Sequence, residues 1–150
     1  MNVGGIFALF GFNEDGKKDS KLKKELEVFK ETPHFKVGMF IKMVSQGIGF
    51  KNQLLKFFSN MQPKMDTEDL GEAGDFMMYN RAWFWISECN LRKKDWKLAL
   101  QDNTSEDFIA YLEVVLKYFE GLEEYEKCAL LKKIQDFVKK SLLEKEDVTP

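Results

Sequence analysis

The sequence is poor in the residues that mark most metal sites, catalytic centres and extracellular proteins. Its 150 residues include one histidine, two cysteines and three prolines. His34 has no cysteine or acidic cluster beside it, so no metal site is expected. Phosphate-binding glycine motifs and the G-x-S-x-G turn of hydrolases are also absent. We therefore expect a protein that is not an enzyme and needs no cofactor.

The two cysteines and the chain's beginning bear on the compartment. Cys89 and Cys128 lie far apart, next to apolar residues, so we expect two buried free thiols in a reducing environment. The first residues lack the positive region of a signal peptide. No apolar run approaches the roughly 18 residues that a membrane-spanning helix needs. A cytoplasmic protein is the expectation.

Arginine is scarce as well. Lysine and arginine together number 23, of which only Arg81 and Arg92 are arginine, and the net charge is −2. Arginine is the residue that most often reads base edges. Its scarcity, with charge of both signs spread along the chain, argues against a nucleic-acid partner.

Helix-forming and apolar residues are abundant. Apolar residues make up 44% of the chain, 14 of them phenylalanine, and prolines and β-branched runs are few. This composition favours helix over strand. We expect an all-α, single-domain bundle of about five to six helices. Residues 1–20 would form an arm and polar linker, 21–142 the bundle, and 143–150 a frayed tail.

The stretch 76–86 is apolar or aromatic nearly all round a helix. Such a helix must be buried on several sides, so a central helix is expected from about Asp75 to Cys89. Arg81 would then need a carboxylate in a structural ion pair. Residues 67–75 are expected to form a loop, because Gly71 and Gly74 disfavour an early helix start.

Apolar spacing predicts the other helices. They cover 21–30, 35–46, 50–60 and 91–100, and two longer helices then meet near Gly121. Ser20 is expected to cap the first, and Thr104 or Ser105 to cap the helix before Gly121. The glycines at 47–49 either separate two helices or kink a single one. The last two helices should form a C-terminal antiparallel hairpin, because their connection is short.

Residues 3–12 (VGGIFALFGF) are apolar and glycine-rich. Glycine makes a regular helix expensive, so an irregular arm packed on the core, either extended or as a short strand, is expected. The alternative is an arm that inserts into a partner protein or a membrane surface. Its candidate contact residues are Ile6, Phe7 and Phe10.

Residues 32–65 contain no acidic residue, whereas residues 66–75 contain five acids and no base. A basic segment with Phe and Met beside its lysines could bind an acidic partner or an anionic membrane. Its candidate contacts are Lys42, Lys51 and Lys56. Lysines on the solvent face of a core-packed helix, paired with the acidic block, would give the same pattern.

Trp96 stands among Lys93, Lys94 and Lys97. Basic residues around an aromatic ring can stack single-stranded nucleic acid. The favoured interpretation is that Trp96 closes one edge of the core while the lysines are solvated.

The last predicted helix begins with an aromatic residue, two charged residues and two small residues, followed by leucine and a basic residue. These positions are Tyr125, Glu126, Lys127, Cys128, Ala129, Leu131 and Lys132. On this pattern, residues 106–140 resemble a UVR-type helical hairpin. Lys133 and Gln135 depart from the pattern, where an acid and an apolar residue are usual. In that family such hairpins pair with one another or with partner proteins. The resemblance thus implies a protein contact, with Tyr125 as a candidate.

Two function classes remain. The first is a non-catalytic protein–protein interaction module: an adaptor, an inhibitor or immunity-type protein, or an assembly subunit that binds another protein or itself. The alternative is a peripheral binder of anionic membranes or polyanions through segment 32–65.

Overall fold

The computed structural model describes residues 17–61 and 66–148, and these form six helices and no strand. The expected arm, with Ile6, Phe7 and Phe10, lies outside the described residues. The helices are α2 (Lys17–Lys30), α3 (Pro33–Met61), α4 (Thr67–Ile86), α5 (Lys94–Asp102), α6 (Glu106–Gly121) and α7 (Tyr125–Val148). The all-α prediction is confirmed.

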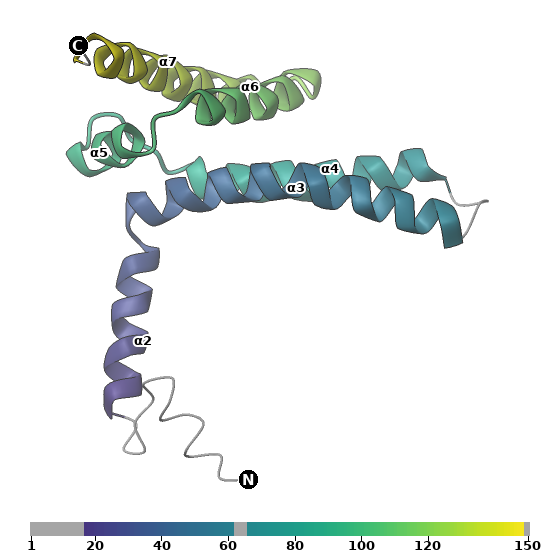
Figure 1. The fold of residues 1–150 in the computed structure, drawn as a ribbon, viewed down its shortest axis with the longest axis horizontal. Coiled ribbons are helices and arrows are strands. Elements are labelled where there is room, and N and C mark those ends of the chain that lie inside the picture. The colour runs from purple at the N-terminus through teal and green to yellow at the C-terminus, as the bar shows by residue number, and fades with distance from the viewer. Residues whose placement is uncertain (1–16, 62–65, 149–150) are drawn as a thin grey trace.

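Two helical hairpins make up the body of the molecule. Helices α3 and α4 pack along each other, as do α6 and α7 (Figure 1). The α6–α7 pair and α5 lie over only one end of the α3–α4 hairpin, whose other end extends past them. Helix α2 leaves that covered end at a steep angle to α3, and α3 is the one helix it contacts among the six that the structure describes.

The core lies where the two hairpins meet. The ring of Phe40 on α3 contacts that of Phe108 on α6, with centroids 5.9 Å apart, and Tyr79 on α4 stacks on Tyr118 at 4.2 Å. Cys89 and Cys128 are buried free thiols, as expected. The fully buried apolar residues of α3 and α4 are Val37, Phe40, Val44, Ala82 and Ile86.

Side-chain caps set several helix ends. Thr32 closes the α2–α3 junction, where its hydroxyl donates to the Phe29 carbonyl and accepts from the Phe35 amide. Ser105, one of the two predicted caps of α6, accepts from the Phe108 amide. Ser20, in contrast, lies inside α2, so its prediction as a cap was wrong.

The expected separation of two helices at Gly47–Gly49 and the expected loop at 67–75 were both wrong. Helix α3 runs unbroken through Gly47 and Gly49, and α4 begins at Thr67, not Asp75. Asp66 caps α4 by accepting from the Glu68 amide, and an acid in the first turn suits the helix dipole. A Cβ on Gly47 would lie 2.2 Å from Met78 Sδ, so this glycine permits the close packing of the two helices.

The α6–α7 turn has an unexpected residue at its sharpest point. Helix α6 ends at Gly121, but Glu123 has the positive φ of 59°. The Glu123 amide donates to the Glu120 carbonyl and the Glu124 amide to the Phe119 carbonyl. These bonds define a Schellman motif with glutamate at the position where glycine is usual.

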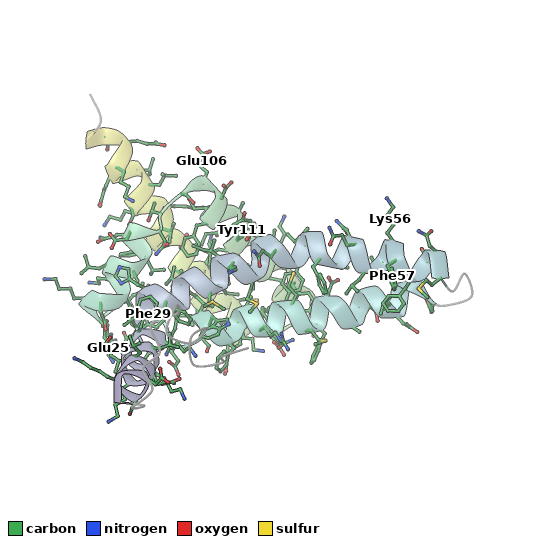
Figure 2. All side chains as sticks on the ribbon, turned by 60° about the horizontal axis from the view of Figure 1, so that its bottom comes forward. Glu25, Phe29, Lys56, Phe57, Glu106 and Tyr111 are labelled. Carbon is green, nitrogen blue, oxygen red and sulfur yellow. The ribbon has the colours of Figure 1, made fainter. Side chains whose placement is uncertain are left out.

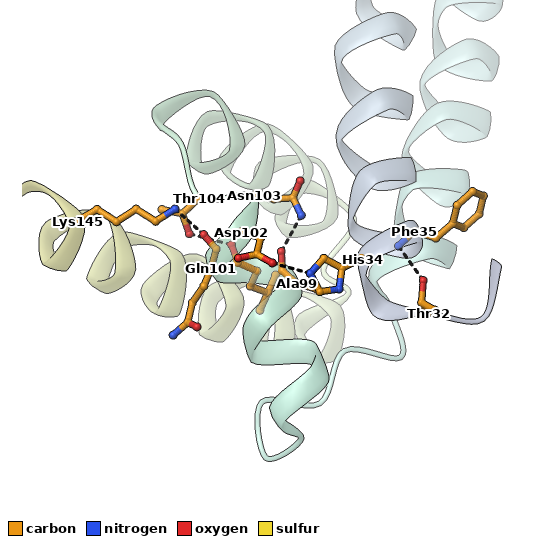
Figure 3. Close-up of polar contacts among 10 residues, drawn as sticks. Thr32, His34, Phe35, Ala99, Gln101, Asp102, Asn103, Thr104 and Lys145 are labelled. Atoms are coloured by element: carbon orange, nitrogen blue, oxygen red, sulfur yellow. Dashed lines mark hydrogen bonds and ion pairs between the residues drawn. The ribbon is translucent and has the colours of Figure 1, made fainter. Parts of the chain in front are cut away.

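The C-terminal helix extends beyond its expected end. Residues 143–148 continue α7 to Val148 and are not a frayed tail. Lys145 Nζ donates to the Gln101 carbonyl at 2.6 Å, which ties this part of α7 to α5 (Figure 3). Because the two residues are 44 positions apart, this contact leaves no periodic pattern in the sequence from which it could be predicted.

Candidate binding groove

A groove runs along one side of the α3–α4 hairpin and has a volume of about 490 Å³. Helix α3 lines it with Lys42, Met43, Gln46, Gly47, Phe50, Lys51, Leu54 and Leu55, and α4 with Leu70, Ala73, Gly74, Met77, Met78 and Arg81. We call this surface the hairpin groove. Its lining is mostly apolar, and Phe50 and Met77 remain 61% and 56% exposed.

Helical periodicity places the hairpin groove away from the core. Met77 and Arg81 are four residues apart and therefore share one face of α4. Tyr79 and Trp83 lie on another face, where their rings contact Tyr118 and Phe119 of α6. The groove thus lies on a side of α4 that α6 does not cover.

The charged groups of the groove are all cationic. Lys51 Nζ lies 2.7 Å from Asp75 Oδ1, and this half-buried pair neutralises one of them. Lys42 and Arg81 are exposed, and neither has an acidic partner among the residues that the structure describes. No aspartate or glutamate lines the groove. It therefore carries two positive charges available to an anionic group.

These two charges lie toward one end of the groove. Gly47 meets Met78, and Lys51 meets Asp75, which fixes the antiparallel register of α3 and α4. In that register Lys42 and Arg81 lie within about one helical turn of each other. From Lys42 to Leu55 the groove extends for about 20 Å along α3, at 1.5 Å per residue. Its remaining length beyond the Lys51–Asp75 pair is lined by apolar residues.

The groove contains some of the predicted contact residues. Lys42 lines it and is free to bind, whereas Lys51 lines it in the ion pair expected between the basic and acidic segments. Lys56 is not a lining residue and points away from α4 (Figure 2). Sequence reasoning placed Met77 in a buried helix and named neither Met77 nor Phe50 as a contact residue, so both were missed. The acid-free run 32–65 was the signal that pointed to this region.

The central helix and Arg81 differ from expectation. Phe76, Met77 and Phe84 of α4 are exposed, so this helix is not buried on several sides. Arg81 is exposed and lines the groove, so its assignment to a buried ion pair was wrong. The error arose because aromatic residues were taken as buried, although none of the other described helices covers the groove side of this hairpin.

Trp96 and Tyr125 lie elsewhere. Trp96 is only 6% exposed in the core, so it cannot be a stacking platform, and Lys93, Lys94 and Lys97 around it are exposed. Tyr125 is 66% exposed at the start of α7, near the α6–α7 turn and apart from the groove. Gln135 of α7, which departs from the UVR-type pattern, is buried against α6, where its Nε2 donates to a carboxylate oxygen of Glu113 at 2.7 Å.

Polar residues at the covered end hold helices together. His34 Nε2 lies 2.8 Å from Asp102 Oδ2, which joins the start of α3 to the end of α5 (Figure 3). Within the described ranges, no group of three or more His, Cys, Asp or Glu residues could hold a metal ion. In the same ranges, no helix is both long and apolar enough to cross a membrane.

The thiols lack the environment of reactive cysteines. Burial raises the pKa of Cys89 to about 12 and also raises that of Cys128. Because the thiolate is the nucleophile, both groups stay in the unreactive protonated form near neutral pH.

Comparisons of the chain with family models, with curated proteins and with solved structures find no match. The resemblance of α6–α7 to a UVR-type hairpin stays a prediction.

Proposed function

We propose that the protein is a non-catalytic protein-binding module that uses the hairpin groove. The observation that supports this is the contiguous apolar lining, from Phe50 and Leu54 across to Met77, which the other described helices leave uncovered. Large exposed apolar surfaces with a polar rim mark interaction sites in soluble proteins. The methionines suit a protein contact, because their flexible side chains adapt to a partner.

The role within this class is that of a cytoplasmic adaptor, inhibitor or assembly subunit. These roles need stoichiometric binding and no chemistry, which agrees with thiols held protonated by burial.

Affinity capture with matched variants tests the proposal. The protein would be immobilised as wild type, Met77→Glu and Leu98→Glu, and lysate proteins retained after moderate-salt and high-salt washes would be quantified. Leu98 is an exposed apolar residue of α5 outside the groove. We expect one protein at near-equal amount through high salt on wild type and Leu98→Glu, and its loss on Met77→Glu. An inert monomer, or equal retention on all three proteins, would contradict the proposal.

A second candidate is peripheral binding to anionic membranes. Lys42, Lys56 and the exposed rings of Phe50 and Phe57 all lie on α3, where they could meet lipid headgroups and acyl chains. This candidate predicts salt-sensitive binding to anionic vesicles that weakens in a Lys42→Glu, Lys56→Glu variant. Lys51 is unsuitable for this test because its ion pair joins α3 to α4. Equal binding to neutral and anionic vesicles, or none to either, would remove this candidate.

A further inference from the structure

We infer that the occupant of the hairpin groove is an amphipathic helix of another protein, with carboxylates beside its apolar stripe at the end that meets Lys42 and Arg81. This inference rests on the proposed function and adds the shape and charge of the bound segment.

The shape of the site favours a helix. The groove lies between two antiparallel helices and is about 20 Å long, which corresponds to nearly four helical turns. Helices with an exposed apolar side are stable in layers that cover that side. A third helix laid along the groove would bury Phe50 and Met77, whose side chains now stand mostly in solvent. Apolar residues at every third or fourth position would meet the groove.

The charge of the site sets the sign of the partner. Lys42 on α3 and Arg81 on α4 flank the same end of the groove, and Lys51 is already matched by Asp75. A carboxylate can accept two parallel hydrogen bonds from the planar guanidinium of Arg81. Acidic residues at that end of the bound helix would therefore be attracted, and basic residues repelled.

The same charges argue against a second copy of this chain as the occupant. Helix α2 presents an exposed apolar stripe of Leu22, Leu26 and Phe29, but its lysines outnumber its acids. Docking α2 into the groove of another copy would bring like charges together. Packing two grooves in the same direction would likewise place Lys42 and Arg81 near their own counterparts, and packing them in opposite directions would set both cations against the apolar end of the other groove. A partner of opposite charge avoids both penalties.

The test uses two designed helical peptides of four to five turns with the same leucine and methionine stripe. The acidic peptide carries glutamates beside one end of the stripe, and the basic peptide carries lysines there. Binding would be measured by fluorescence anisotropy, and the contact located from the methyl NMR signals of Met43, Met77 and Met78. Three proteins are compared: the wild type, a double charge reversal that combines Lys42→Glu with Arg81→Glu, and the control Lys97→Glu on α5.

We expect the acidic peptide to shift the three methyl signals and to bind wild type at least about tenfold more tightly than the basic peptide. The double reversal should invert this preference, whereas Lys97→Glu should leave it unchanged. Inversion by a charge exchange is an outcome that general misfolding would not produce.

Other outcomes separate the two levels of the proposal. Equal binding of both peptides, with Met77→Glu still abolishing capture of the cellular partner, would overturn the inferred charge and leave the proposed function standing. Neither peptide shifting the methyl signals, together with capture indifferent to Met77→Glu, would overturn both. Binding of anionic vesicles but of neither peptide would replace the helix with a membrane surface.

Discussion

Two regions of this molecule have similar amino acids and opposite packing. The closed region comprises α5, α6 and α7 with residues 33–46 of α3 and 79–86 of α4. The open hairpin comprises residues 47–61 and 67–78. Val37, Phe40 and Val44, the fully buried apolar residues of α3, all belong to the closed region. In the open hairpin, by contrast, Phe50, Phe57 and Met77 are mostly exposed.

The difference lies in the number of layers. In the closed region a second helical hairpin covers the first, so one phenylalanine can meet another, as Phe40 meets Phe108. The open hairpin has a single layer of two helices, which can bury only the residues between them (Figure 1). Burial here follows tertiary arrangement more than residue type, and an apolar residue in the open hairpin is available to bind.

The largest expected effect comes from removing the same ring in each region. Phe108→Ala in the closed region should lower the free energy of unfolding by about 3–5 kcal/mol, because it deletes a buried ring and leaves a cavity. Phe50→Ala in the open hairpin should change it by less than about 0.5 kcal/mol. Chemical denaturation of both variants measures the two values.

The contrast between these two variants matters more than either value. A large loss in Phe50→Ala would mean that the open hairpin is covered in solution, for example by another copy. Its denaturation midpoint would then also depend on protein concentration, which a monomer would not show.

Thiol reactivity gives a second contrast. Cys89 and Cys128 of the closed region should resist alkylation in the folded protein at pH 8, because burial limits access and raises both pKa values. In a Met77→Cys variant the new thiol should react at the rate of a free thiol. Equal protection of all three thiols would contradict the open surface.

The pKa of Cys89 also gives a pH dependence. Its ordinary value of 9.0 is raised to about 12 in the fold, so the folded state favours the protonated thiol. The associated stability is present below pH 9 and is lost as pH rises toward 12, because the unfolded chain ionises first. Burial likewise raises the pKa of Tyr79 and Tyr118. Cys89→Ala should therefore flatten part, not all, of the alkaline decline in stability.

The sequence was sufficient where local chemistry decides the structure. The hydroxyl of Ser105 caps α6 because that contact lies three residues away, and the periodic apolar residues after it predict the α6–α7 hairpin.

The sequence was insufficient where a distant element determines the structure. A break or a kink at Gly47 was expected from helix propensity, but the helix continues there and the glycine packs against Met78 across the hairpin. Exposure of Met77 likewise depends on which helices cover α4. The sequence indicated the groove only as a region without acidic residues. Its lining depends on the register of α3 against α4, which cannot be derived without knowing that these two helices pair.

The smallest expected effect compares two glycines of the same helix within the open hairpin. Gly49→Ala should raise the free energy of unfolding by about 1 kcal/mol, because alanine favours helix and, apart from the adjoining helix backbone and neighbouring residues, no atom lies within 4 Å of the added Cβ. Gly47→Ala offers the same gain in propensity, but its Cβ would lie 2.2 Å from Met78 Sδ. The Met78 side chain must move, which should offset the gain and displace its methyl signal within the groove. An equal gain in both variants, with the Met78 signal unchanged, would show that the two helices are not held as closely as this contact requires. A gain in Gly49→Ala alone would confirm that α3 accepts glycine at 47 for its fit against α4.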